Sequence, residues 1–184
     1  MDADEPDAGL IARALQGSDA AFATLMGRHK GWAFRFIRRY VGNGDDAWDV
    51  LQDSFFAAWL ALSRFDTTLS FEAWLRRIAL NKCRDRARRN LVRRFLVGMP
   101  TDADDEPLDA PDPAPGIEQQ LDVQQDLQRL ERQIAQLPRS LKEPLLLTTL
   151  EGLSHREAGE LLGINAKAVE MRVYRARERL KSEG

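Results

Sequence analysis

The side chains of this chain that are best suited to chemistry are basic and polar groups near its C-terminus. Lys167, Arg172 and Arg175 lie in one short stretch with Asn165 and Glu170. Arginine and lysine donate hydrogen bonds to phosphates and guanine edges, and glutamate accepts one from cytosine. These residue types therefore predict a surface that contacts nucleic acid, provided that the local fold holds them on one exposed face.

Two helices joined by a sharp turn are predicted to position these side chains. Ser154 followed by Glu157 is a capping box, so a helix begins there, and Gly163 ends it. Asn165 is a good cap for the second helix. The apolar residues of the first helix are Ala158, Leu161 and Leu162, and those of the second are Val169, Val173, Ala176 and Leu180. This is the layout of a helix-turn-helix.

The alternative is an ordinary surface hairpin of two helices whose basic residues are only solvated. Turn chemistry, caps and periodicity all agree with a helix-turn-helix, which favours that interpretation. Its second helix, with a buried stripe and a free polar side, could then lie in the major groove of DNA.

A second basic element lies in the middle of the chain. Between Arg76 and Arg94 there are nine basic residues and one acid, Asp85. A helix that neutralises phosphates in this way binds nucleic acid strongly and in a salt-dependent manner. Asn81 and Asp85 lie one turn apart and could position bases. The alternative is a solvated helix end, because basic residues favour helix C-termini, but nine positive charges exceed what that effect explains.

The N-terminal part is predicted to be helical throughout. The expected helices cover residues 10–16, 19–42, 45–62 and 71–95, with a loop at 65–69. Ser18 or Asp19 caps the second helix, Ser70 caps the fourth, and Asn43 with Gly44 forms a turn. Phe71 and Trp74 share helical spacing with later apolar residues, which favours a core role over base stacking. No stretch alternates as a strand does, so the predicted fold class is all-α.

Charge divides the chain into segments. The formal net charge is only −2, yet residues 95–128 contain nine acids and no lysine or arginine. Residues 98–116 hold five of the eight prolines, a composition typical of an extended linker. We therefore expect helical domains at 8–96 and 117–182, joined by an acidic, flexible linker at 97–116. Further helices are predicted at 117–136 and 141–151.

The sequence carries no catalytic constellation. The two histidines, His29 and His155, have no cysteine or carboxylate cluster at metal-ligand spacing, and no glycine-rich phosphate loop is present. Cys83 is the only cysteine and is expected to be inert. We predict a protein that is not an enzyme and uses no cofactor or metal. The acidic N-terminus and the absence of a long apolar run predict a cytoplasmic location without membrane insertion.

Three blocks, in their order and spacing, resemble the extracytoplasmic-function sigma factors. These are small bacterial members of the housekeeping sigma factor family that keep only regions two and four. The blocks are D-D-A-W-D-V-L-Q-D-S-F-F-A-A-W at 45–59, R-F-D-T-T-L-S-F-E-A-W-L-R-R-I-A-L-N-K-C-R-D-R-A-R-R at 64–89, and V-Y-R-A-R-E-R-L at 173–180. The resemblance covers about residues 10–182.

The resemblance implies a docking site for RNA polymerase. In the family, a helix with an acid and then Gln-acid-small-Phe binds the clamp helices of the beta-prime subunit. The matching residues are Asp49, Gln52, Asp53, Phe55 and Phe56, of which Phe55 or Phe56 would pack on the partner. The alternative is that acids such as Asp49 only stabilise a helix N-terminus.

The resemblance also implies two DNA sites. A loop that captures an unstacked base of the minus-ten element would consist of Asp66, Thr67, Thr68, Leu69 and Ser70. The adjoining helix would hold the backbone and help to melt the duplex through Asn81, Arg84, Asp85, Arg88 and Arg89. The helix-turn-helix would read the minus-thirty-five element through Asn165, Lys167, Glu170, Arg172 and Arg175.

The chain departs from the family pattern at three positions. Ala168 and Glu170 stand where the family often has Thr and Lys, which puts the usual upstream contacts in doubt because Glu170 repels phosphate. Trp48 stands where a polar residue is common, and is either buried or in contact with a partner.

The implied function is a promoter-specificity subunit. Its implied partners are core RNA polymerase (the beta-prime clamp helices and the beta flap), promoter DNA and an anti-sigma factor. The linker would pass through the polymerase near the active centre, the alternative being a simple tether. One rival interpretation is a stand-alone dimeric regulator, and another is a nucleic-acid enzyme. The sequence shows no sign of the dimer surface, ligand pocket or carboxylate cluster that these would need.

Overall fold

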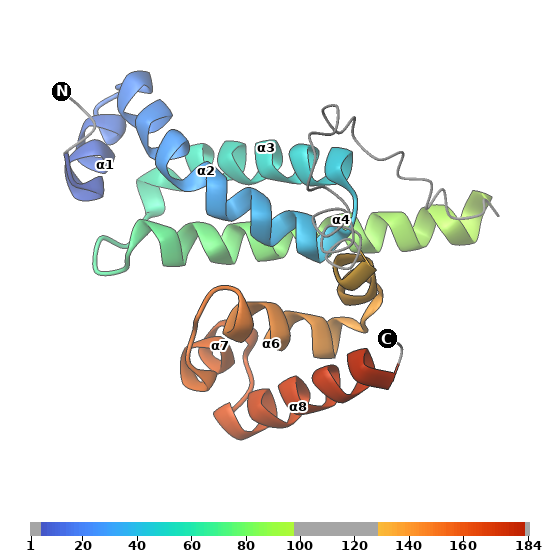
Figure 1. Ribbon diagram of the computed structural model, residues 1–184. Helices are drawn as coiled ribbons and strands as arrows, with labels where there is room; N and C mark the ends of the chain where they lie inside the picture. The colour runs from blue at the N-terminus through green and yellow to red at the C-terminus, as the bar shows by residue number, and fades with distance from the viewer. Residues whose placement is uncertain (1–4, 98–128, 183–184) are drawn as a thin grey trace, which may run out of the picture. The chain divides into compact units, whose positions relative to one another are not determined.

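The computed structural model describes residues 5–97 and 129–182, which form helices joined by short turns and contain no strand (Figure 1). Two compact units, Met1–Arg89 and Asn90–Gly184, divide the chain. The helices are α1 (Asp7–Leu15), α2 (Asp19–Val41), α3 (Gly44–Ala61), the 3-10 turn η1 (Leu62–Arg64), α4 (Phe71–Val97), α6 (Arg139–Thr149), α7 (His155–Leu162) and α8 (Ala166–Ser182). Residues 129–136 are also helical. The predicted all-α class is confirmed.

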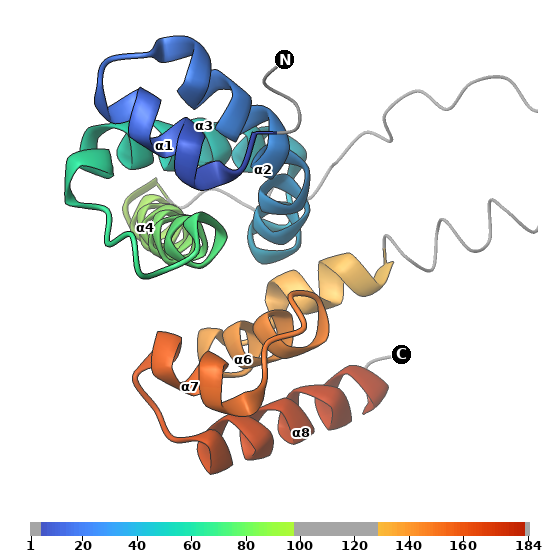
Figure 2. The ribbon, with the colours of Figure 1, turned by 90° about the vertical axis from the view of Figure 1, so that its left-hand side faces the viewer.

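Helix α2 is central to the N-terminal unit. Its buried residues recur at helical spacing and are Ala21, Phe22, Leu25, His29, Ala33, Phe36, Ile37 and Tyr40. Helices α1 and α3 pack against α2, and α4 runs beside α2 and α3 in both views (Figures 1 and 2). Phe71, Leu75 and Cys83 of α4 complete the core. The buried position of Cys83 agrees with the inert role expected for it.

Local capping groups set the helix ends of this unit. The Ser18 side chain accepts a hydrogen bond from the Ala21 amide at 3.3 Å, and Ser70 accepts one from Ala73 at 3.1 Å. Asn43 was expected in a turn, but it is the N-cap of α3, where it accepts from the Asp46 amide at 3.0 Å. Two helices begin earlier in the chain than predicted. Helix α3 begins at Gly44 instead of residue 45, and α1 begins at Asp7 instead of residue 10.

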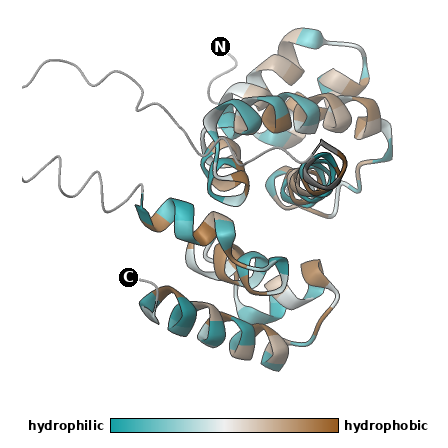
Figure 3. Cartoon of the chain, turned by 90° about the vertical axis from the view of Figure 1, so that its right-hand side faces the viewer, coloured by the Kyte–Doolittle hydropathy of each residue, from teal (hydrophilic) through white to brown (hydrophobic). Residues whose placement is uncertain are grey.

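The C-terminal unit is a small bundle whose core joins α6, α7 and α8. Its buried apolar side chains include those of Leu145, Leu146, Leu147, Val169 and Val173. Bands of hydrophilic and hydrophobic residues follow the helices of this unit (Figure 3). The Lys142 ammonium group, which is buried, donates to the Ala135 carbonyl and so ties α6 to the helical residues 129–136.

The turn between α7 and α8 has the predicted form. Both bonds of the Ser154–Glu157 capping box are present, and Gly163 ends α7 with a left-handed φ of 70°. The Asn165 carboxamide oxygen accepts from the Ala168 amide at 2.8 Å, which caps α8. The helix-turn-helix is thus fixed by three local devices that the sequence already displayed. The helix predicted at 117–136 and the linker at 97–116 lie largely outside the described residues.

Candidate nucleic-acid and protein interfaces

Helix α8 buries one side and exposes the other. Val169, Val173 and Ala176 face the core, while Lys167 and Arg175 are exposed and Arg172 is half-buried. This arrangement is the one that a helix needs if it is to be held by its own domain and still enter the major groove.

Three of the predicted contact residues at and before the start of α8 also have partners within the chain. The Lys167 ammonium lies 3.0 Å from a Glu170 carboxylate oxygen, and the Asn165 oxygen is engaged in the cap. The ion pair offsets the negative charge of Glu170, which reduces the repulsion of phosphate that its position would otherwise produce.

The prediction from sequence missed two residues on this surface. Met171 and Tyr174 are 41% and 60% exposed, respectively, although both are large and apolar. They lie opposite the buried stripe: Met171 is four residues after Lys167, and Tyr174 is three residues after Met171. That spacing was visible in the sequence, but only charged and polar residues of this helix were predicted to contact DNA.

The basic side of α4 is partly neutralised by its own neighbours. The Arg84 guanidinium donates to Asn81 at 3.2 Å, and Arg88 donates to Asp85 at 2.5 Å. Both pairs lie one turn apart on the same helix. Because these contacts are largely exposed, they hold the side chains in place with little energy and can be exchanged for DNA phosphates.

The loop before α4 is fixed by a local turn. One Asp66 carboxylate oxygen accepts from the Thr68 amide at 2.9 Å and from the Thr68 hydroxyl at 2.7 Å. The side-chain bond and then the backbone bond from Thr68 lower the pKa of Asp66 below its ordinary value. Thr67, Leu69 and Ser70 are exposed, so the loop presents polar groups on a preformed turn.

Three aromatic rings pack against one another at the two ends of this loop. The Phe65 ring lies 5.1 Å from the Trp74 ring, and Phe71 lies 5.6 Å from Trp74. Phe71 is buried, as its spacing predicted, whereas Trp74 is only half-buried between these rings.

The outer side of α3 carries the acids and the amide that were expected to meet a partner. Asp49, Gln52 and Asp53 are all exposed. The two phenylalanines differ: Phe56 is 63% exposed, whereas Phe55 is only 3% exposed and belongs to the core. The suggestion that Phe55 contacts a partner directly is therefore corrected, because no part of its ring is free to do so.

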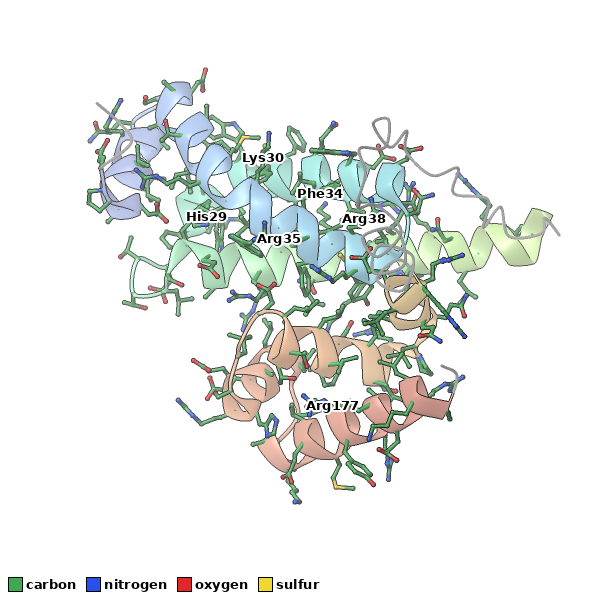
Figure 4. All side chains as sticks on the ribbon, viewed as in Figure 1. His29, Lys30, Phe34, Arg35, Arg38 and Arg177 are labelled. Atoms are coloured by element: carbon green, nitrogen blue, oxygen red, sulfur yellow. The ribbon has the colours of Figure 1, made fainter. Side chains whose placement is uncertain are left out.

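Trp48 extends this side of α3. It is 46% exposed and packs on Phe34 of α2, with ring centroids 4.3 Å apart (Phe34 is labelled in Figure 4). The tryptophan is thus neither buried nor isolated: one side of its ring lies on Phe34 and part of it is available to solvent.

Ion pairs link the acidic side of α3 to the basic side of α4. Arg86 binds Asp46 and lies 3.3 Å from Asp49, and Arg89 lies 3.7 Å from Asp53. The hydrogen bond to Asp46 raises the pKa of Arg86 further above its ordinary value. The surfaces predicted for a protein partner and for DNA are therefore adjacent in the N-terminal unit and share these pairs.

Two further kinds of site in the described residues would be a metal site and a membrane span. Residues 5–97 and 129–182 contain no cluster of three or more histidine, cysteine or acidic side chains that could hold a metal ion. No helix in those ranges is both long and apolar enough to cross a membrane.

Comparison with known families matches both units. The family model for Sigma-70 region 2 matches residues 25–94, and the model for Sigma-70, region 4 matches residues 127–180. The first range holds the α3 and α4 surfaces with the loop between them, and the second holds the helix-turn-helix.

Named relatives are similar over almost the whole chain. The RNA polymerase sigma factor CnrH of Cupriavidus metallidurans is 40% identical, over 99% of this chain and 96% of its own length. The sigma factor NccH of Alcaligenes xylosoxydans is 39% identical, over 95% of this chain and 92% of its own length. The ECF sigma factor SigW of Bacillus subtilis is 27% identical, over 94% of each chain.

Solved structures share the fold. CnrH in complex with the cytosolic domain of CnrY aligns with a TM-score of 0.66 and 32% identity, covering 96% of this chain and 95% of CnrH. The sigma factor RpoE of Bartonella quintana, solved with the anti-sigma factor NepR, aligns with a TM-score of 0.67 and 23% identity. That alignment covers 88% of this chain and 94% of RpoE.

Proposed function

This chain belongs to the extracytoplasmic-function sigma factors, and we propose that three surfaces on its two units perform the steps of promoter recognition. A sigma factor binds core RNA polymerase, recognises the minus-ten and minus-thirty-five elements and initiates transcription. It is not an enzyme, so every step depends on binding surfaces. The family match confirms the resemblance first seen in the sequence, and the rival interpretations as a stand-alone regulator or a nucleic-acid enzyme fall away.

The outer side of α3 is the proposed docking site for the beta-prime clamp helices. Asp49, Gln52 and Asp53 supply hydrogen-bond acceptors and one amide, and Phe56 supplies exposed apolar area. Clamp-helix arginines would compete with Arg86 and Arg89 for the two carboxylates. Those internal contacts are long, 3.3 and 3.7 Å, and the two carboxylates are 64% and 51% exposed, so the loss of these contacts costs little.

The loop at 66–70 and the basic side of α4 are the proposed minus-ten site. The preformed Asp66–Thr68 turn keeps polar groups in place for a base that has left the stack. Asn81, Arg84 and Arg88 would hold the adjoining backbone. The exposed side of α8, including Arg175, is the proposed minus-thirty-five site, because its buried side is fully used by the core.

Regulation by an anti-sigma factor is supported by a relative. CnrH was solved with the cytosolic domain of CnrY, and CnrH is 40% identical to this chain along nearly its full length. We infer that a comparable anti-sigma protein binds this chain, and that the chain acts in the cytoplasm, where polymerase and DNA are found.

The observation that carries the proposal is the occurrence of a region-two match and a region-four match on two separate helical units of one chain. The test is in vitro transcription by purified core polymerase on a pool of promoter fragments, with and without the chain. Initiation at a small set of sites only when the chain is present is the expected result. Failure to co-elute with core polymerase would contradict it.

The docking assignment predicts different effects for the two adjacent phenylalanines. Phe56→Ala, like the double change of Gln52 and Asp53 to Ala, should weaken binding to core polymerase at least several-fold and leave stability nearly unchanged, since Phe56 is exposed. Phe55→Ala should instead lower the free energy of unfolding by roughly 3–5 kcal/mol, as for other buried rings. Affinity is measured by titration with labelled core polymerase and stability by urea unfolding. Unchanged core affinity of the Phe56 variant would refute the assignment.

A further inference from the structure

Two large apolar side chains occupy the middle of the exposed side of α8. Lys167, Met171, Tyr174 and Glu178 follow one another on successive turns and lie opposite the buried stripe. Glu170 and Arg175 therefore flank this row on its two sides. Single exposed apolar residues are common, but two together at the centre of a surface that must meet a ligand indicate an apolar contact with that ligand.

A hollow borders this pair. It has a volume of about 710 Å³ and lies between the first turn of α7 and the middle of α8. Its lining from α8 includes Glu170, Met171, Tyr174 and Arg177, and Ser154 and His155 line it at the start of α7 (Arg177 is labelled in Figure 4). In helix-turn-helix proteins the second helix reads base edges while the first crosses the DNA backbone. A backbone strand at the start of α7 would therefore pass beside this hollow, with Arg177 as the cation for a phosphate and Glu170 as an opposing charge, and Met171 and Tyr174 would face the bases.

The chemistry of the major groove narrows the choice of base. The edges of guanine, cytosine and adenine present only hydrogen-bond donors and acceptors there, whereas thymine also presents a C5-methyl group. An apolar pair at the centre of the surface that faces the bases therefore gains the most binding free energy by contact with thymine. We propose that Met171 and Tyr174 select thymine in the upstream promoter element by contact with its C5-methyl group. This inference rests on the proposed function, because it requires that α8 lie in the major groove.

The test uses holoenzyme made from the full chain and core polymerase. First, upstream elements are selected from a library with a randomised minus-thirty-five region, which checks the proposed function on its own. Each thymine of the selected element is then replaced singly by deoxyuridine, which lacks only the methyl group. At one or two positions, affinity should fall about fourfold, which corresponds to about 0.8 kcal/mol at 1.4 kcal/mol per tenfold. Met171→Ala or Tyr174→Ala should abolish that difference.

Two controls separate a methyl contact from a general defect. Tyr174→Phe keeps the ring and should keep the preference for thymine over uracil. Leu130→Ala removes a side chain that is 42% exposed, close to the 41% of Met171, but lies outside the hollow, so it should also keep the preference.

Three outcomes would overturn the inference. Equal affinity of the wild-type holoenzyme for thymine and uracil at every position would exclude a methyl contact. Alanine variants that bind core polymerase less well yet still discriminate thymine from uracil would show that the pair contacts protein instead. If no upstream sequence is selected at all, the assignment of α8 to the minus-thirty-five element fails, and this inference fails with it.

Discussion

At the scale of single residues, His29 shows how a polar side chain joins two helices of the N-terminal unit. Its Nε2 atom lies 2.7 Å from an Asp7 carboxylate oxygen, and its Nδ1 atom accepts from the Trp32 indole at 3.1 Å. Indole is a donor only, so the ring carries its proton on Nε2 and donates it to Asp7. Arg28 donates to the other Asp7 oxygen at 2.8 Å. Asp7 thus adds polar contacts to the apolar packing of Leu10, Ile11 and Ala14, which also holds α1 in the unit.

Asp7→Asn is expected to lower the free energy of unfolding by roughly 1 kcal/mol at pH 7. Burial acts to raise the pKa of Asp7, but the hydrogen bonds from His29 and Arg28, together with the charge of Arg28, outweigh it and lower that pKa below the ordinary 3.8. A lowered pKa means that the stabilisation is complete above the unfolded value and is lost as the pH falls through the folded value. Urea unfolding at pH 7 and pH 3 should therefore show a difference between the two proteins that shrinks at pH 3.

The matched control for Asp7 is an exposed ion pair in the other unit. Arg156 lies 3.1 Å from Glu160, one turn apart, and both are largely exposed. Glu160→Gln should change stability by less than about 0.5 kcal/mol at either pH. An Asp7→Asn effect that is the same at pH 7 and pH 3 would show that lost packing, and not the carboxylate charge, is responsible.

Prediction from the sequence succeeded for some single residues and failed for others, as Phe55, Met171 and Tyr174 show. Phe55 and Leu51 lie four residues apart on α3, which puts them on the same side of the helix, and the structure buries both. Only the transfer of a role from the family pattern had put Phe55 on the surface. Met171 and Tyr174 were missed for the opposite reason, since apolar residues were assumed to be core. In each case the position relative to the buried stripe was informative and the residue type alone was not.

At the scale of helices and turns, α7 and α8 approach closely because of one glycine. The Gly159 carbonyl accepts from the Ile164 amide at 3.0 Å. A Cβ atom added at Gly159 would lie 2.5 Å from the Ile164 carbonyl oxygen, which is backbone and cannot turn away. Gly27, in the exposed middle of α2, has nothing within 4 Å of such an atom.

The same substitution at these two glycines should therefore have opposite effects. Gly159→Ala is expected to destabilise the C-terminal unit by roughly 1–3 kcal/mol, because the turn must open to relieve the overlap. Gly27→Ala should stabilise the N-terminal unit by about 0.5–1 kcal/mol, since alanine loses less conformational entropy in a helix. Thermal unfolding followed by circular dichroism measures both. Equal effects at the two sites would contradict the close approach at Gly159.

The links between α3 and α4 differ in burial and should differ in energy. The side chains of Arg86 and Asp46 are 24% and 21% exposed, whereas those of Arg89 and Asp53 are 60% and 51% exposed. Double-mutant cycles with alanine should give a coupling energy of roughly 1–2 kcal/mol for the first pair and about 0–0.5 kcal/mol for the second. Similar coupling in both pairs would mean that Arg89 is not free to leave Asp53 for DNA.

Three helix starts were predictable from local caps, whereas the local cap Asn43 was predicted only as part of a turn. Ser18, Ser154 and Asn165 each bond to an amide three residues ahead, so their positions could be read from the sequence alone. The start of α1 could not, because its N-cap is Pro6, whose side chain makes no capping bond. The ion pairs between α3 and α4 join residues about forty positions apart, and no local pattern predicts them.

At the scale of the whole molecule, the two surfaces proposed to contact DNA lie on different units. The α4 surface belongs to the N-terminal unit and the α8 surface to the C-terminal one, and each unit has its own core. Groups on separate cores share no hydrogen-bond network, so changes at the two sites should act independently. The net charge of −2 gives no indication of these basic surfaces, because the charges of basic and acidic segments cancel in the sum.

Independence can be tested with one arginine from each unit. Arg84→Ala should impair the minus-ten step and Arg175→Ala the minus-thirty-five step, with losses of about 1–3 kcal/mol in promoter binding if Arg175 reads a base bidentately. In the double variant, the two losses should add to within about 0.5 kcal/mol.

A promoter with a premelted minus-ten region should restore activity to the Arg84 variant, because the strands no longer need to be opened. It should not restore activity to the Arg175 variant, whose defect lies in the upstream duplex. Rescue of both variants, or a double loss far from the sum, would mean that the two surfaces act as one.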